Sequence, residues 1–142
     1  MKRASGVLMH VSSLPGQYSE GSFGREAYDW IDFLAESGFT CWHVLPFCLP
    51  DEYNSPYKSY SSFSLNPYFI DLPTLAKKGL ITQSELDGAR QQTPYSCEFN
   101  RLSRERIELL SLAASRVRDR SGVLAFIKDH PHTEEFCRFM AL

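Results

Sequence analysis

The sequence has few features that point to a nucleic-acid partner or to a membrane. Its 142 residues carry 15 lysines and arginines against 17 aspartates and glutamates, which gives a formal net charge of -2. A nearly neutral chain lacks the basic footprint of a nucleic-acid-binding protein. No apolar run approaches the roughly 18 residues that a membrane-spanning helix needs. We therefore predict neither a nucleic-acid partner nor a membrane partner.

Cysteine is scarce and scattered. The four cysteines, at positions 41, 48, 97 and 137, form no CxxC pair. This spacing argues against a disulfide framework and against a zinc site. We predict reduced cysteines that mostly contribute to packing.

The N-terminus begins with basic residues, as a signal peptide does, but the apolar run that follows is short. Only Val7, Leu8 and Met9 lie between Gly6 and His10, and no small-residue cleavage site comes after them. The segment therefore does not read as a secretory leader. A cytoplasmic location is the expectation.

Motifs of nucleotide binding and of nucleophilic catalysis are also lacking. The chain contains neither G-x-x-x-x-G-K nor G-x-G-x-x-G. His10 has no Cys or Ser partner at a meaningful spacing, so a histidine in the core or at a strand end is favoured. Proline separates His130 from His132 and keeps them off a single helical face, which favours loop histidines over a metal pair. We predict no catalytic residue, no metal site and no cofactor from these patterns.

The start of the chain has the pattern of a β-α-β unit. Residues 5–11 and 39–45 contain apolar runs without alternation, which predict strands buried on both faces. Between them, residues 26–37 carry an apolar stripe at helical spacing, followed by Gly38 as a stop residue. The stripe consists of Ala27, Trp30, Ile31 and Leu34. A helix of this length allows a right-handed crossover, so the strands should be parallel.

The second half of the chain is mostly helical by pattern. Residues 68–72 predict a short strand, residues 73–79 one or two helical turns, and residues 82–90 a helix opened by a capping box of Thr82 and Glu85. From residue 103 a charged helix follows, whose mixed charges predict that its arginines are solvated. Further helices are expected at 123–129 and after a cap at Thr133. The expected apolar stripe of the charged helix is Ile107, Leu110, Ala114 and Val117.

A segment rich in tyrosine, serine and asparagine, residues 54–71, joins these halves. Ser55-Pro56 and Asn66-Pro67 are each followed directly by tyrosine, and the residue before a proline is held in an extended or turning conformation. Hydroxyl-bearing aromatic rings among small polar residues suit a sugar. The loop also leaves the carboxyl end of a predicted parallel strand, where α/β folds build their sites.

Carboxylates lie near this loop without forming an evident pair. Glycoside chemistry usually needs two carboxylates at a defined separation. The sequence gives no reason to pair Asp51, Glu52 or Asp71, and Asp71 could equally cap the turn at Pro73. The loop therefore predicts contact with a ligand and not catalysis.

Five motifs in order carry a family resemblance. They are HVSSLPG at residues 10–16, FGREAY with DFLA at 23–28 and 32–35, WHVLP at 42–46, NSPYKSYSSF at 54–63 and NPYFIDL at 66–72. Together they resemble the N-terminal part of the 4-alpha-glucanotransferases, the amylomaltases or disproportionating enzymes of glycoside hydrolase family 77. Residues 73–142 resemble that family more weakly.

The resemblance implies an α/β fold, the start of a (β/α)8 TIM barrel with a mostly helical inserted subdomain. It also implies enzymes that cut an α-1,4 bond, form a covalent intermediate on an aspartate and pass the glucan to a 4-hydroxyl with retention. A barrel takes roughly 250 residues, so we expect a truncated N-terminal piece that lacks the catalytic carboxylates. Residues 1–72 would hold the first strands, the helix and the substrate-contacting loop, and residues 73–142 an incomplete helical insertion.

The resemblance also implies a site. Ser55 and Tyr57 match family positions that contact donor sugar, and Asn54 stands where an aspartate is common. Glu52 replaces an aromatic residue that serves a second glucan site. The segment at residues 18–21 lacks a glycine usual there. The implied partners are α-1,4-glucans.

Two alternatives stay open at this point. The chain could be a non-catalytic α-glucan-binding module, or a small α/β domain whose aromatic loop only packs, with Tyr57 and Tyr60 buried. If the strands are separated from barrel neighbours, their edges and apolar faces are exposed, and we then expect an aggregation-prone chain.

Overall fold

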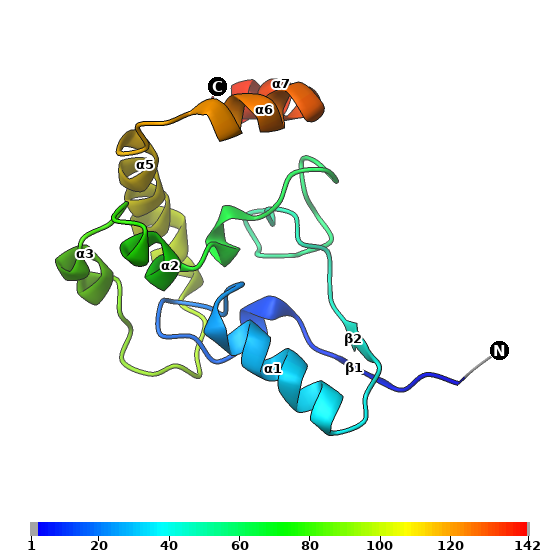
Figure 1. The fold of residues 1–142 in the computed structure, drawn as a ribbon. Helices are drawn as coiled ribbons and strands as arrows, with labels where there is room; N and C mark the ends of the chain where they lie inside the picture. Colours follow the sequence, from blue (N-terminus) through cyan, green and yellow to red (C-terminus); the bar gives the residue numbers. More distant parts are fainter. Residues whose placement is uncertain (1–2, 142) are drawn as a thin grey trace.

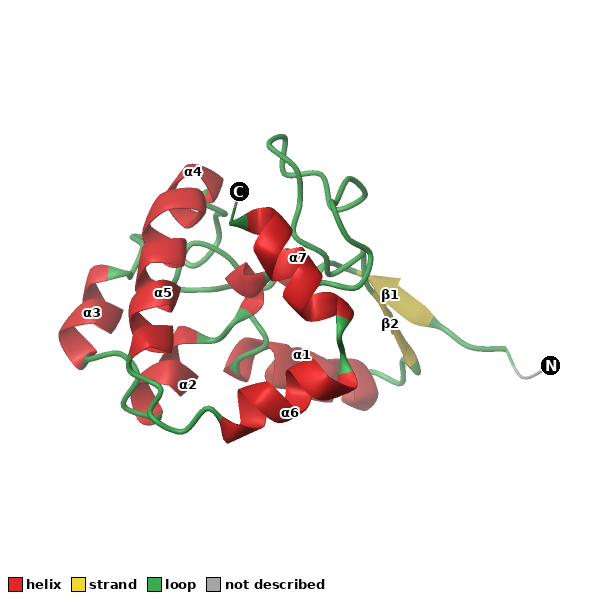
Figure 2. Cartoon of the chain, turned by 90° about the horizontal axis from the view of Figure 1, so that it is seen from above, coloured by secondary structure: helices red, strands yellow, loops and turns green. Residues whose placement is uncertain are grey.

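A computed structural model describes residues 3–141 and shows a mixed chain of short strands and helices. The β1-α1-β2 unit lies at one end, helices α2, α3 and α5 lie beside it, and α6 and α7 form a helix pair that follows α5 (Figures 1 and 2). None of the helices in residues 3–141 is long and apolar enough to cross a membrane. The elements are β1 (Gly6–Leu8), α1 (Arg25–Glu36), β2 (Cys41–His43), α2 (Leu72–Lys77), α3 (Gln83–Gly88), α4 (Phe99–Arg101), α5 (Ile107–Ser115), α6 (Ser121–Asp129) and α7 (His132–Met140).

The predicted β-α-β unit is confirmed. Strands β1 and β2 pair in parallel, with Gly6 opposite Cys41 and Leu8 opposite His43. Both strands are shorter than predicted, and β1 ends early because the chain turns into a 3-10 helix at Val11–Ser13. The prediction that both faces are buried is wrong for this chain. Only the central residue of each strand is half-buried, and Leu8 is exposed, because within the described residues each strand has a single neighbour.

Helix α1 follows its predicted bounds closely. Ala27 and Leu34 are buried and Trp30 packs on the core cluster, but Ile31 lies outside that face and is exposed. Gly38 has a φ of +79°, and its N–H donates to Ala35 O. With the Phe39 N–H donating to Leu34 O, these bonds close a Schellman motif. This turn directs the chain back into β2.

Local capping decides the structure of the middle segment. The predicted strand at residues 68–72 is wrong: the Asn66 side chain accepts from the Tyr68 N–H and starts a 3-10 turn, Pro67–Phe69. Asp71 then caps α2 by accepting from the Thr74 N–H at 2.9 Å. The capping box of Thr82 and Glu85 is confirmed at the start of α3.

The charged helix differs from its predicted pattern. A π-helical turn, Leu102–Arg106, precedes α5, and its wider turn changes which residues face inward. Leu102, Arg106 and Ala113 are buried, whereas the predicted Ile107 is exposed. The inward face of α5 packs on a second core cluster that includes Leu72, Ile81 and Leu86.

Two of the arginines predicted to be solvated are engaged instead. Arg116 makes a bidentate ion pair with Glu85, with both N–O distances at 2.7 Å. Arg106 is buried at 5% exposure. The charge pattern of the helix did not indicate either contact, because the partners, Glu85 for Arg116 and the Ile70 and Tyr18 carbonyls for Arg106, lie outside this helix.

Two smaller predictions are also wrong. Helix α7 begins at His132, after Pro131, and has no side-chain cap, so Thr133 lies inside the helix. The cysteines are free, but Cys41, Cys97 and Cys137 are exposed and do not contribute to a packed core.

Arg106 joins three separate parts of the chain. Its Nη1 donates to Ile70 O at 3.1 Å, and its Nη2 donates to Tyr18 O. Glu20, only 4% exposed, lies in the same region. Burial raises the pKa of Glu20 to about 7, although the charge of Arg106 acts in the opposite direction. Burial lowers the pKa of Arg106 to about 10.

Within residues 3–141, two non-glycine residues have left-handed backbone conformations. Ser19 has a φ of +72° and is buried, and Asn54 has a φ of +59° and is exposed. Ser19 falls in the segment at residues 18–21, where the resemblance predicts a glycine. A Cβ in this region costs about 1–2 kcal/mol, and asparagine tolerates it better than other residues.

We expect Ser19→Gly to stabilise the chain by up to about 1 kcal/mol, because relief of the left-handed strain exceeds the extra entropy of glycine in the unfolded state. The matched variant Asn54→Gly should change the free energy of unfolding less. Urea unfolding of the three proteins measures both effects. A destabilised Ser19→Gly variant would contradict the expectation.

The buried Glu20 carboxyl should also make stability depend on pH. Between about pH 4.5 and 7 the unfolded chain releases this proton while the folded chain retains it, so stability falls as pH rises across that window. At about 1.4 kcal/mol per pKa unit, the loss is roughly 2–3 kcal/mol. Glu20→Gln should remove this part of the slope in urea unfolding at pH 5 and 7.5. The exposed control Glu52→Gln should retain it, and equal slopes in all three proteins would refute the assignment.

Candidate functional site

The loop after β2 is anchored at its base, and aromatic rings near its tip lie beside α7. The Asn66 N–H donates to Phe47 O at 2.7 Å, and Cys48 and Leu65 form an isolated antiparallel bridge. Between these contacts the loop rises from the carboxyl end of β2 (Figure 1). The loop therefore leaves the carboxyl end of a parallel strand, as predicted, and its contact with a ligand stays a prediction.

Asp51 organises the turn that holds the predicted site residues. Its Oδ1 accepts from the N–H of Tyr53 at 3.1 Å and of Ser55 at 3.0 Å. Its carbonyl accepts from the Asn54 N–H at 3.0 Å, and Asn54 takes the left-handed conformation that closes the turn. The carboxylate thus has a structural use, which explains why an acidic residue stands here without a catalytic partner.

The aromatic side chains of the loop point to solvent. Tyr57 is 72% exposed and Tyr60 is 68% exposed. Tyr60 lies 5.9 Å from Phe139 of α7, and Phe63 lies 5.3 Å from His132, measured between ring centroids. The alternative in which the aromatic loop only packs is favoured by buried tyrosines, and the exposure of Tyr57 and Tyr60 does not support it.

A small cavity of about 150 Å³ lies beneath this turn. Asn54 is one of its lining residues, whereas Ser55 and Tyr57 do not line it. The predicted residues thus divide between two faces of the loop. The cavity also receives side chains from the end of β1, the loop before α1 and the 3-10 turn: His10, Ser12, Ser13, Glu20, Asn66, Tyr68 and Phe69.

Burial and charge set the protonation of the cavity wall. His10 lies after the end of β1, as expected, stacked 5.9 Å from Phe47 and edge-on to Phe69 at 5.3 Å. Burial lowers the pKa of His10, so the ring is neutral at pH 7. Burial, together with the negative charge of Glu20, raises the pKa of Tyr68. The cavity therefore offers a neutral imidazole, a phenol and a carboxyl group that titrates near neutrality.

Sequence reasoning included Tyr68 in the predicted loop but missed Glu20 and Arg106 as its neighbours. No motif connects them, because they come from three segments that meet only in the fold. Arg106 did leave a signal: Leu102, Arg106, Leu109 and Ala113 have helical spacing, with one arginine in an otherwise apolar stripe. Glu20 left no comparable signal.

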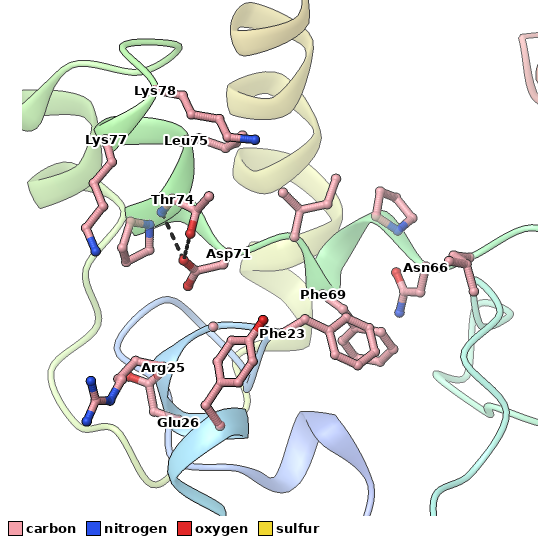
Figure 3. Close-up of a pocket in the computed structure, with 16 residues that line it drawn as sticks. Phe23, Arg25, Glu26, Asn66, Phe69, Asp71, Thr74, Leu75, Lys77 and Lys78 are labelled. Carbon is pink, nitrogen blue, oxygen red and sulfur yellow. Dashed lines mark hydrogen bonds between the residues drawn. The ribbon is translucent and has the colours of Figure 1, made fainter. Parts of the chain in front are cut away.

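A larger hollow of about 810 Å³ lies between the start of α1 and α2 (Figure 3). Phe23 and Phe69 form its apolar wall, and Arg25 and Lys77 lie near its rim. Asp71 is occupied there by capping bonds to the N–H and Oγ1 of Thr74 at 2.9 and 2.6 Å. Because this carboxylate is already bonded and none of Asn54, Ser55 and Tyr57 lines the hollow, we place the candidate site at the loop.

Metal chemistry has no evident centre in the described part of the chain. Residues 3–141 contain no group of three or more His, Cys, Asp or Glu side chains placed to hold an ion. The arrangement at the loop can bind a polar ligand through exposed rings.

The chain matches a known family over most of its length. The family model for 4-alpha-glucanotransferase covers residues 9–142. The 4-alpha-glucanotransferase of Streptococcus pneumoniae is 39% identical over 99% of this chain, and that of Thermus thermophilus is 48% identical over 57% of it. A plant relative from Arabidopsis thaliana, 34% identical over 87% of this chain, is named chloroplastic/amyloplastic, so the cytoplasmic location stays a prediction here.

A solved structure also matches this chain over almost its whole length. The amylomaltase from Streptococcus agalactiae, in complex with acarbose, superposes with a TM-score of 0.90 at 34% identity over 99% of this chain. The chain spans 29% of the length of the Streptococcus pneumoniae relative and 29% of that structure. On these matches, the chain belongs to the 4-alpha-glucanotransferase family, glycoside hydrolase family 77.

Proposed function

We propose that this chain is the N-terminal part of a 4-alpha-glucanotransferase that moves α-1,4-glucan segments to glucose or to another glucan with retention. In this role β1, α1 and β2 are the first units of a (β/α)8 barrel, and the loop after β2 contacts the glucan. The observation that carries the proposal is the exposure of Tyr57 on an anchored loop at the carboxyl end of a parallel strand. That end of the strands is where barrel enzymes build their sites.

In this proposal the loop residues contact the substrate, and other parts of the protein carry out catalysis. The turn held by Asp51 supplies Asn54, Ser55 and Tyr57 for substrate contact. Two carboxylates near it have structural uses, since Asp51 holds the turn and Asp71 caps α2. In this proposal the nucleophile and the acid/base group lie outside this chain, and the acarbose in the Streptococcus agalactiae structure supports an α-glucan as the ligand.

We expect Tyr57→Ala to weaken binding of maltoheptaose by about tenfold, because a stacked aromatic ring contributes roughly 0.5–1.5 kcal/mol beyond its buried area. Tyr57→Phe keeps the ring and should lose only the part due to the hydroxyl. Tyr95→Ala, which removes an exposed tyrosine outside the loop, is the matched control and should bind as the unchanged protein does. Calorimetry on the product of the complete reading frame gives the three affinities. Equal affinities for Tyr57→Ala and Tyr95→Ala would refute the loop assignment.

The catalytic part of the proposal has its own test. The purified 142-residue chain should release no glucose from maltotriose, whereas the product of a reading frame that continues past Leu142 should do so. Glucose release by the 142-residue chain alone would show that the catalytic carboxylates lie within it. Saturable glucan binding without transfer by every product of the frame would favour the non-catalytic binding module.

A further inference from the structure

The tip of the loop after β2, residues 59–63, lies along one face of α7. The ring centroid of Tyr60 is 5.9 Å from that of Phe139, and α7 runs beside the loop (Figures 1 and 2). The ring centroid of Phe63 is 5.3 Å from that of His132. Since the first ring of the tip meets the end of α7 and the second ring meets its start, the tip runs antiparallel to the helix.

The spacing of the two contacts matches on both sides. His132 and Phe139 are two helical turns apart, so their side chains lie on one face, about 10 Å apart along the axis. The chain from Tyr60 to Phe63 spans at most about 10 Å. Phe136, which lies between the two contacts on the same helical face, is half-buried. Two contacts at matched spacing fix the direction of the tip as well as its place.

The hydrogen bonds of the tip do not fix its position. Within residues 3–141, the hydrogen bonds of residues 59–63 join Ser59 with Ser61 and Ser61 with Phe63. Turns of this kind shape a short segment without attaching it to another element. The ring contacts with α7 therefore decide where the tip lies.

The helix pair is itself loosely attached, so these contacts can open. None of the described residues of α6 and α7 is buried, and neither helix contributes to the two core clusters. Residues 117–120, which join the pair to α5, form no helix or strand. Phe63 remains 78% exposed and Phe139 57% exposed in this contact. Elements with few buried apolar contacts open locally, and one aromatic pair shifts such an equilibrium only about two- to tenfold.

Tyr57 lies between the Asp51 turn and the tip. The Lys58 N–H donates to Ser55 O at 3.2 Å and turns the chain around Tyr57. Asp51 holds Ser55 from the other side. Two residues separate Tyr57 from Tyr60, where the contact with α7 begins. A tip that leaves α7 therefore changes the direction in which the Tyr57 ring points.

We propose that α7 positions the loop that carries Tyr57, with Phe139 and His132 as positioning residues that hold the tip by ring contact. While the tip lies on α7, the Tyr57 ring faces its ligand; when the tip leaves α7, the ring loses that direction. The fraction of molecules with the tip on α7 then sets the apparent affinity of the loop. The inference rests on the proposed function for the ligand, and it places a control of binding on a helix outside the loop.

Trypsin cleavage after Lys58 measures how often the tip leaves α7, because Lys58 is exposed and adjoins the tip. In the product of the complete reading frame, we expect Phe139→Ala to speed this cleavage about two- to tenfold relative to cleavage after Lys78 in the same sample. Phe139→Tyr keeps the ring and should be cleaved at the original rate. The control Leu124→Ala, which removes an exposed side chain of α6, should also leave the rate unchanged. Unchanged cleavage in Phe139→Ala, or equal acceleration by Leu124→Ala, would overturn the proposal.

A double variant tests the contact itself. Because Tyr60→Ala removes the partner ring, adding Phe139→Ala to it should speed the cleavage no further. Additive acceleration would show that Phe139 acts through another contact and would refute the assignment.

Kinetics separate positioning from a general loss of stability. A positioning residue of this kind affects binding, so Phe139→Ala and His132→Ala should each raise KM for maltotriose about two- to tenfold and leave kcat nearly unchanged. A smaller folded fraction would instead lower kcat and leave KM unchanged, and that result would overturn the proposal.

The outcomes also separate this inference from the proposed function. If Tyr57→Ala weakens maltoheptaose binding while Phe139→Ala changes neither the cleavage nor KM, the inference fails and the proposed function stands. If Phe139→Ala speeds the cleavage while Tyr57→Ala leaves maltoheptaose binding unchanged, the contact with α7 is supported and the loop assignment is refuted.

Discussion

The buried guanidinium of Arg106 fixes the relative position of segments that are far apart in the sequence. It donates to the carbonyl of Ile70, 36 residues away, and to that of Tyr18, 88 residues away. A buried guanidinium is tolerated only where its donors are satisfied, so these two carbonyls and α5 must hold their places together. Glu20 follows Tyr18 by two residues, and Tyr68 precedes Ile70 by two. The wall of the cavity therefore depends on an interaction made outside it.

Patterns that depend on neighbouring residues predicted much of the fold. The Schellman turn at Gly38 and the capping box of Thr82 and Glu85 were evident, because the bonds that form them join residues a few positions apart. The parallel pairing of β1 with β2 joins residues 35 positions apart, but it followed from the two apolar runs and the helix between them. The 3-10 turn at Asn66 was missed for a related reason. The apolar run at residues 68–72 was predicted to be a strand, but the Asn66 side chain accepts a hydrogen bond from the Tyr68 N–H and starts a tight turn there.

What the sequence did not predict depends on contacts between distant segments. The π-helical turn before α5 changes which side of the following helix is buried. The apolar stripe predicted for an ideal helix therefore included Ile107, which is exposed, and left out Ala113, which is buried. The bidentate pair of Arg116 with Glu85 joins α5 to the cap of α3 and cannot be read from either helix alone. At the site, the loop and its exposed tyrosines were predictable from composition and position. Glu20 was not, because the segments that surround it come together only in the fold.

The turn held by Asp51 gives the loop two distinct faces, and that separation has a physical consequence. Exposed rings such as Tyr57 offer a large contact area and do not require hydrogen bonds in a fixed direction, so they are suited to binding a ligand made of repeated units. Asn54 takes the left-handed conformation at the junction and lines the cavity. A change in this turn therefore alters the outer and the inner face of the loop at once.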